Sequence, residues 1–210
     1  MRILGIGPVT SCGNGVAALE HILAGTAQPA REVKQITTPN GPVELPVYTA
    51  DAAGLENFAP KRSLRRMDPF TRKALLAAYL AVEDSGLELK DKTRVGVVFG
   101  SAYGMLEASF AFQDTIIEDG DADASPTLFA SSVHGALASG VSMRLGIQGP
   151  TATVTNFDRT CASVFETAAC WLASGDVDYV LAGCGDEYHP VAGYAAAALR
   201  GECRYEPGES

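Results

Sequence analysis

The stretch Thr151–Ala168, TATVTNFDRTCASVFETA, predicts a strand, a sharp turn and a helix. After the turn, apolar side chains recur with helical spacing over residues 159–174, at Cys161, Phe165, Ala168 and Leu172. A side chain at such a turn lies at the N-terminus of a helix, where negative charge is favoured. This is a common place for a nucleophile. Here the turn carries Asp158, and Cys161 follows three residues later.

Composition limits the classes of function. The chain has 210 residues, a net charge of −9 and 47% hydrophobic residues, which suits one domain with a buried core. The negative charge argues against nucleic acid as a partner, because nucleic-acid binding depends on neutralising phosphates. No segment approaches the roughly 20 apolar residues of a membrane span. The first residues also lack the apolar core of a signal peptide.

The five cysteines are odd in number, scattered and without CxxC spacing: Cys12, Cys161, Cys170, Cys184 and Cys203. This pattern suits reduced thiols in a cytoplasmic protein rather than a disulfide framework or a zinc site. We therefore expect neither a metal nor a cofactor.

Strands alternate with helices along the chain, which predicts a layered α/β domain. We expect a first strand at Arg2–Ile6 and buried strands within 94–101 and 176–188. We expect one domain over residues 1–200, followed by a frayed tail at 201–210.

A long helix is predicted between Asp68 and Gly86. The aspartate accepts unpaired backbone N–H groups, and Pro69 fits the first helical turn. Glycine readily adopts the left-handed conformation that ends a helix.

Several stretches, in order and at matching spacings, resemble the N-terminal half of the β-ketoacyl synthases. They are GIGPVTSCGNGVAALEHILAG (5–25), RRMDPFTRKALLAAYLAVEDSGL (65–87), GVVFGSAYG (96–104), SPTLFASSVHGALASGVSMRLGIQGP (125–150) and SGDVDYVLAGCGDEY (174–188). The resemblance implies half of a thiolase fold, with α-β-α layers around a mixed, mostly parallel five-stranded sheet.

The sequence departs from this family at the nucleophile. The resemblance places the catalytic cysteine eight residues beyond the proline of the Gly-Pro turn, and counting from Pro150 reaches Asp158. The serines that follow the family's cysteine are replaced by Arg159 and Thr160.

The resemblance assigns the two catalytic histidines and a lysine to the second half of the fold. None of His21, His134 and His189 matches them. No catalytic residue is therefore assigned in this chain.

Two interpretations of Asp158 follow. It caps the helix of a retired active site, or it acts as a general acid or electrostatic group in a decarboxylation. A carboxylate is a weak nucleophile, so it suits acyl transfer poorly. For Cys161, the apolar spacing favours a buried structural thiol over a nucleophile.

A basic cluster stands out in this acidic chain: Lys61, Arg62, Arg65, Arg66, Arg72 and Lys73. It is either a solvated approach to a helix or, as the resemblance implies for Lys61, Arg62, Arg65 and Arg66, a docking site for an acidic acyl carrier protein. The resemblance further implies a dimer interface at Thr151, Thr153, Thr155, Phe157 and His134.

The hypothesis that follows is a non-catalytic subunit resembling a chain-length factor. It would form a heterodimer with a full-length ketosynthase subunit in fatty acid or polyketide elongation, for example of the aryl polyene type. The alternative is an independent acyltransferase or malonyl decarboxylase that uses Cys161 or Asp158. A third possibility is a scaffold or acyl-carrier protein without a ketosynthase partner.

Overall fold

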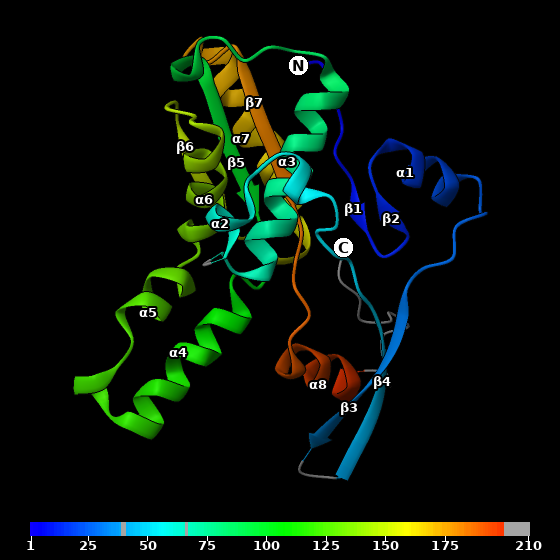
Figure 1. Ribbon diagram of the computed structural model, residues 1–210, viewed down its shortest axis with the longest axis vertical. Coiled ribbons are helices and arrows are strands. Elements are labelled where there is room, and N and C mark those ends of the chain that lie inside the picture. The colour runs from blue at the N-terminus through cyan, green and yellow to red at the C-terminus, as the bar shows by residue number, and fades with distance from the viewer. Residues whose placement is uncertain (39–40, 66, 200–210) are drawn as a thin grey trace.

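The computed structural model describes residues 1–38, 41–65 and 67–199 (Figure 1). The predicted frayed tail, 201–210, lies outside these residues. The strands are β1 (Val9–Thr10), β2 (Gly13–Asn14), β3 (Arg31–Thr38), β4 (Gly41–Tyr48), β5 (Val95–Gly100), β6 (Thr151–Val154) and β7 (Tyr179–Cys184). The α-helices are α1 (Val16–Leu23), α2 (Lys61–Leu64), α3 (Pro69–Ser85), α4 (Leu106–Asp119), α5 (Pro126–Ser132), α6 (Gly135–Leu145), α7 (Thr160–Ser174) and α8 (Pro190–Leu199).

Short 3-10 turns join several of these elements: η1 (Leu55–Asn57), η2 (Lys92–Arg94), η3 (Asp121–Asp123) and η4 (Phe157–Arg159). No helix in the described ranges is both long and apolar enough to cross a membrane.

The central sheet has three parallel strands in the order β6-β5-β7. Every residue of β5 is buried, because helices cover both faces of the sheet (Figure 1). Val95, Val97 and Phe99 belong to the larger core with α3 and α6. Val98, on the opposite face, packs against α7. The layers are therefore α-β-α, as predicted.

Helix α3 has the predicted boundaries. The Asp68 carboxylate accepts a hydrogen bond from the backbone N–H of Thr71 at 2.7 Å, and Pro69 is the first helical residue. Gly86 ends the helix with φ of 64°, in the left-handed region that favours glycine. Leu75, fully buried, lies in the core on this helix.

The predicted α/β class is confirmed, but the sheet has three strands in the described residues and not five. The segment Arg2–Ile6 is not a strand. Gly5 and Gly7 instead bring it so close to α3 that a Cβ at Gly7 would lie 2.0 Å from the carbonyl oxygen of Ala77. Strands β3 and β4 form a separate antiparallel hairpin. The three central strands found in the described residues are all parallel, so this part of the sheet is not mixed.

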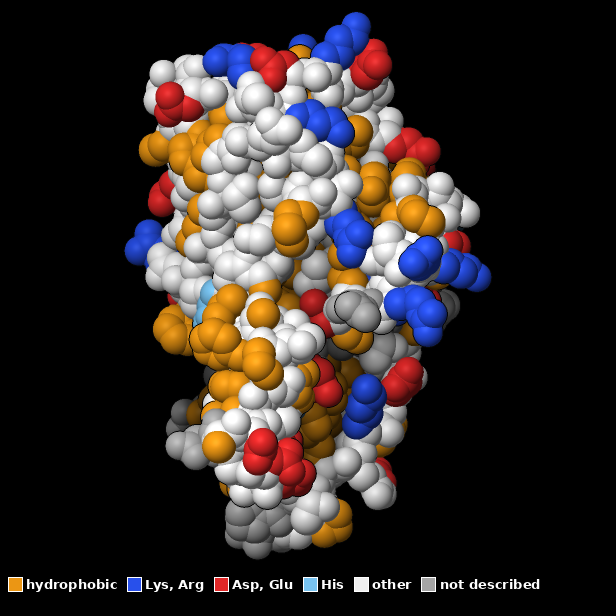
Figure 2. All heavy atoms as spheres, turned by 60° about the vertical axis from the view of Figure 1, so that its left-hand side comes forward, with side chains coloured by type: hydrophobic (Ala, Val, Ile, Leu, Met, Phe, Trp, Pro, Cys, Tyr) orange, Lys and Arg blue, Asp and Glu red, His pale blue; other side chains and the backbone are white. Residues whose placement is uncertain are grey.

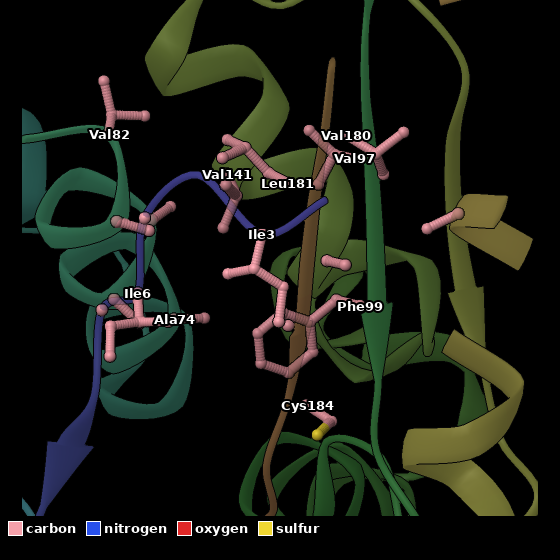
Figure 3. Close-up of a pocket in the computed structure, with 18 of the residues that line it drawn as sticks. Ile3, Ile6, Ala74, Val82, Val97, Phe99, Val141, Val180, Leu181 and Cys184 are labelled. Atoms are coloured by element: carbon pink, nitrogen blue, oxygen red, sulfur yellow. The ribbon is translucent and has the colours of Figure 1, made fainter. Parts of the chain in front are cut away.

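A cavity of about 550 Å³ separates this N-terminal segment from strand β7. Figure 3 shows Ile3, Phe99 and Leu181 around this space, which is lined mainly by apolar side chains. Within the described residues β7 has β5 as its only strand partner, so its other edge borders the cavity. No described strand therefore covers the apolar lining of the cavity or the outer edge of β7.

Helices α4 and α5 form an arm that projects from the layered body (Figure 1). The two helices are joined by a contact between Phe112 and Phe129, whose ring centroids lie 5.4 Å apart. Ile117 and Phe129 are 80% and 55% exposed. Figure 2 shows hydrophobic side chains gathered on the lower part of this face. Exposed apolar surface of this kind is a usual mark of an interaction site.

Candidate functional site at the carboxyl ends of the strands

Three loops meet where strands β5, β6 and β7 end. Because the strands are parallel, their carboxyl ends lie at one edge of the sheet, which is the usual place for a site in such folds. The loops comprise residues 101–105, 155–159 and 185–189. A strained turn and a pair of carboxylates lie in these loops, and two cysteines lie next to them, one at the start of α7 and one at the end of β7.

Asp158 lies in the turn between β6 and α7, as predicted. The preceding Phe157 has φ of 44°, the one positive φ at a non-glycine residue in the described part of the chain. Such a conformation is costly for an aromatic side chain and persists where neighbours hold it. The backbone N–H of Asn156 donates to the Thr160 hydroxyl at 2.9 Å, and its side-chain amide donates to the Ser163 hydroxyl at 3.0 Å. Both hydrogen bonds tie Asn156 to the beginning of α7 and so hold the turn in place.

The interpretation of Asp158 as a helix cap is wrong. Residue Arg159 occupies the cap position of α7, and no side chain forms a capping hydrogen bond there. The turn η4 precedes the helix and displaces its start by one residue. Asp158 is exposed to solvent.

Cys161 is exposed, so the prediction of a buried structural thiol is also wrong. It lies in the first turn of α7, on a face whose neighbour Phe165 is 44% exposed while Ala168 is 2% exposed. The sheet therefore covers the apolar stripe of α7 at Ala168 but not at its N-terminal end. Cys184, at the end of β7, lies beside Cys161.

Two carboxylates that follow β7 organise the neighbouring loop, and neither was predicted from the sequence. Asp186 accepts hydrogen bonds from the Ser101 hydroxyl at 2.6 Å and from the backbone N–H of Tyr103 at 3.1 Å. Glu187 accepts from the backbone N–H of Glu107, in the first turn of α4, at 3.0 Å. Their position directly after a parallel strand was the signal that could have found them. That strand, β7, lies at the edge of the sheet and is partly exposed rather than buried as predicted.

The pKa of Glu187 is raised from its ordinary value of 4.5 to about 7. Burial is the largest cause, and the nearby carboxylates of Asp68 and Glu107 raise the pKa further. The N–H of Glu107 and the charge of Lys73 oppose the shift. Below about pH 7 the Glu187 carboxyl is therefore mostly protonated in the folded protein.

A loss of stability with rising pH follows from this shift. Between about pH 4.5 and 7 the folded state binds more protons at Glu187 than the unfolded state, so the free energy of unfolding falls as pH rises through this window. Glu187→Gln should remove this decline, because the amide is neutral and its oxygen still accepts from Glu107. Urea denaturation at several pH values measures the effect.

The matched control is Glu20→Gln, which changes an exposed carboxylate on α1. It should leave the pH dependence as in the parent chain. The raised pKa of Glu187 would be contradicted if the free energies of unfolding of the parent and of Glu187→Gln differed by the same amount at pH 5 as at pH 7.5.

The histidines do not form a common centre with Asp158 in any contact of the described residues. His134 is exposed and lies against Gly104, where a Cβ would be 2.6 Å from its Nε2. The His189 ring stacks on Phe110 at 4.5 Å and lies 3.9 Å from the Glu107 carboxylate. Within the described ranges, no group of three His, Cys, Asp or Glu side chains is arranged to hold a metal ion.

Strand β6 presents a free edge. The backbone N–H groups of Val97 and Ser101 donate to the carbonyls of Pro150 and Val154. The carbonyls of Pro150 and Val154 therefore point toward β5. Since backbone groups alternate along a strand, Thr151 and Thr153 direct their N–H and C=O groups away from the sheet. No described strand pairs with that edge. Phe157, just beyond it, is 69% exposed.

The basic cluster lies on and beside helix α2. Lys61, Arg62 and Arg65 are exposed, whereas Arg66 lies outside the described residues. Arg72 is directed inward, and its guanidinium donates to the Leu64 carbonyl at 2.9 Å. The exposed charges are compatible with both interpretations, a solvated surface and a docking site.

The family model of the β-ketoacyl synthase N-terminal domain matches residues 2–207. The chain therefore belongs to the β-ketoacyl synthase family.

Curated relatives include the 3-oxoacyl-[acyl-carrier-protein] synthase 2 of Vibrio cholerae, which is 27% identical over 98% of this chain and 50% of its own length. The enzyme of the same name from Vibrio harveyi is 29% identical over 71% of this chain and 37% of its own length. The chain spans about half the length of the first of these relatives.

Solved structures with the same fold include the ishigamide ketosynthase/chain length factor, with a TM-score of 0.76 and 18% identity over 98% of this chain and 57% of that one. The ketosynthase ApeO in complex with its chain length factor ApeC, from Xenorhabdus doucetiae, gives a TM-score of 0.69 and 16% identity over 92% of this chain and 49% of that one. These likenesses establish the fold.

Proposed function

We propose that this chain is a non-catalytic, chain-length-factor-like subunit. It pairs with an active β-ketoacyl-[acyl-carrier-protein] synthase and helps to shape the pocket in which the acyl chain grows. The observation that carries the proposal is Asp158, an exposed aspartate at the strand-to-helix turn where the family resemblance expects a nucleophilic cysteine. A carboxylate at this turn does not readily accept an acyl group.

Features of the surface support pairing. The outer edge of β6 has backbone groups at Thr151 and Thr153 that no described strand pairs with, and an edge of this kind readily pairs with another strand. Phe157 lies exposed at its end, and the α4–α5 arm carries further apolar side chains. The predicted interface residues Thr155 and His134 are exposed beside these features.

Acyl-carrier docking at Lys61, Arg62 and Arg65 is the second part of the proposal. Their positive charge would steer an acidic carrier protein to the subunit despite the net charge of −9. A cytoplasmic location fits the free cysteines found in the described residues.

The experiment is co-expression of this chain with the full-length ketosynthase encoded nearest to it, followed by native mass spectrometry. The account predicts a stable 1:1 complex. A well-behaved homodimer that ignores the ketosynthase would contradict the proposal.

A second candidate is an independent acyltransferase or decarboxylase, and the exposure of Cys161 favours it. This candidate predicts an acyl thioester on Cys161 when the chain alone meets an acyl thioester substrate. The proposed subunit should remain unmodified under the same conditions.

A further inference from the structure

Two cysteines far apart in sequence meet at the end of the central sheet. Gly100, the last residue of β5, is the cross-strand partner of Cys184 on β7. The first turn of α7 lies over the same glycine: a Cβ at Gly100 would lie 2.6 Å from the side-chain methyls of Thr160 and Val164 and 3.5 Å from the Cβ of Cys184. Glycine is thus needed for this close approach, which brings the start of α7 next to the end of β7.

The Cys161 side chain, in the first turn of α7, reaches the Cys184 side chain at this junction and forms a hydrogen bond with it. Both Cys161 and Cys184 are exposed and free. Partial burial of its thiol is the main cause that raises the pKa of Cys184 to about 12, followed by the adjacent Cys161 and by Asp186. The raised pKa keeps the Cys184 thiol protonated, so we assign the first attack on a peroxide to Cys161, which is exposed in the first turn of α7.

We propose that Cys161 and Cys184 are a redox-active dithiol that closes to an intramolecular disulfide when a peroxide is present. The thiolate of Cys161 attacks one peroxide oxygen, which forms an S–O bond, breaks the O–O bond and releases water after protonation. The Cys184 sulfur then displaces the hydroxyl of this sulfenic acid as a second water, and an S–S bond results. Two thiols and one hydrogen peroxide thus give one disulfide and two water molecules.

The disulfide would join both sides of the site. On one side it holds the first turn of α7, directly after Asp158 and Arg159. On the other it holds the end of β7, directly before Asp186 and its hydrogen bonds to Ser101 and Tyr103. A cross-link restricts the unfolded chain most strongly, so the oxidised form should be the more stable one. A thiol reductant returns the open form.

The test uses the full chain treated with hydrogen peroxide, followed by alkylation, proteolysis and peptide mass spectrometry without reduction. The account predicts a cross-linked pair of peptides that contain Cys161 and Cys184, loss of two hydrogen atoms from the intact monomer, and recovery with dithiothreitol. It also predicts a higher melting temperature for the oxidised chain.

Variants separate the roles of the two thiols. In Cys184→Ala, the sulfenic acid on Cys161 has no partner, so labelling by dimedone should rise by about tenfold over the parent chain. Cys170→Ala changes an exposed cysteine further along α7 and should leave the cross-link unchanged. Equal dimedone labelling in the parent and in Cys184→Ala, or a disulfide that joins other cysteines or separate chains, would overturn the proposal. The parent measurement alone decides the matter if a variant fails to fold.

Discussion

Thr153→Pro should strongly weaken assembly with the ketosynthase subunit while leaving the fold of this chain intact. The N–H of Thr153 points away from β5, so proline removes no hydrogen bond within the sheet. A strand that pairs with β6 must approach to about 4.7–4.9 Å, where the proline ring replaces a hydrogen-bond donor. Loss of that donor leaves a partner carbonyl unsatisfied, at about 1–3 kcal/mol, and the ring adds a steric cost. We expect affinity to fall by about 100-fold or more.

Thr153→Val is the matched control. The Thr153 hydroxyl is buried and lacks a hydrogen-bond partner in the described residues, so its replacement by a methyl group should not weaken the fold. The backbone N–H remains, so the complex should form as it does with the parent chain. Circular dichroism melts check that both variants are folded, and titration by biolayer interferometry measures affinity. Unchanged affinity in Thr153→Pro would place the interface elsewhere.

The elements that the sequence predicts well are those determined by local chemistry. Helix α3 begins at an aspartate with a proline after it and ends at a glycine, and each of these signals acts within one helical turn. Strand β5 is recognisable because a continuous apolar run suits a strand covered on both faces. The family resemblance supplied the α-β-α arrangement of these elements.

The features that the sequence predicts poorly depend on what lies opposite each element. Spacing shows that Cys161, Phe165 and Ala168 share a face of α7, but it does not show what covers that face. In the structure the sheet covers Ala168 and leaves Cys161 and Phe165 exposed. The cap prediction for Asp158 failed because the backbone of Phe157 turns into η4 before the helix begins.

The missing strand at Arg2–Ile6 has a similar cause. Its apolar composition suits a strand, but pairing requires a neighbouring edge within reach. Gly5 and Gly7 bring the segment against α3, on the far side of the cavity from β7. Nothing in the sequence of residues 2–6 indicates how far this segment lies from β7.

The central claim is that the chemistry belongs to the partner, and acylation measures this most directly. The co-purified complex is incubated with acyl-[acyl-carrier-protein], digested and mapped by mass spectrometry, once with the parent ketosynthase and once with its nucleophilic cysteine replaced by alanine. The account predicts an acyl group on the ketosynthase cysteine in the first complex and none on either chain in the second. An acyl group on Cys161 or Asp158 of this chain, retained when the partner lacks its nucleophile, would contradict the account.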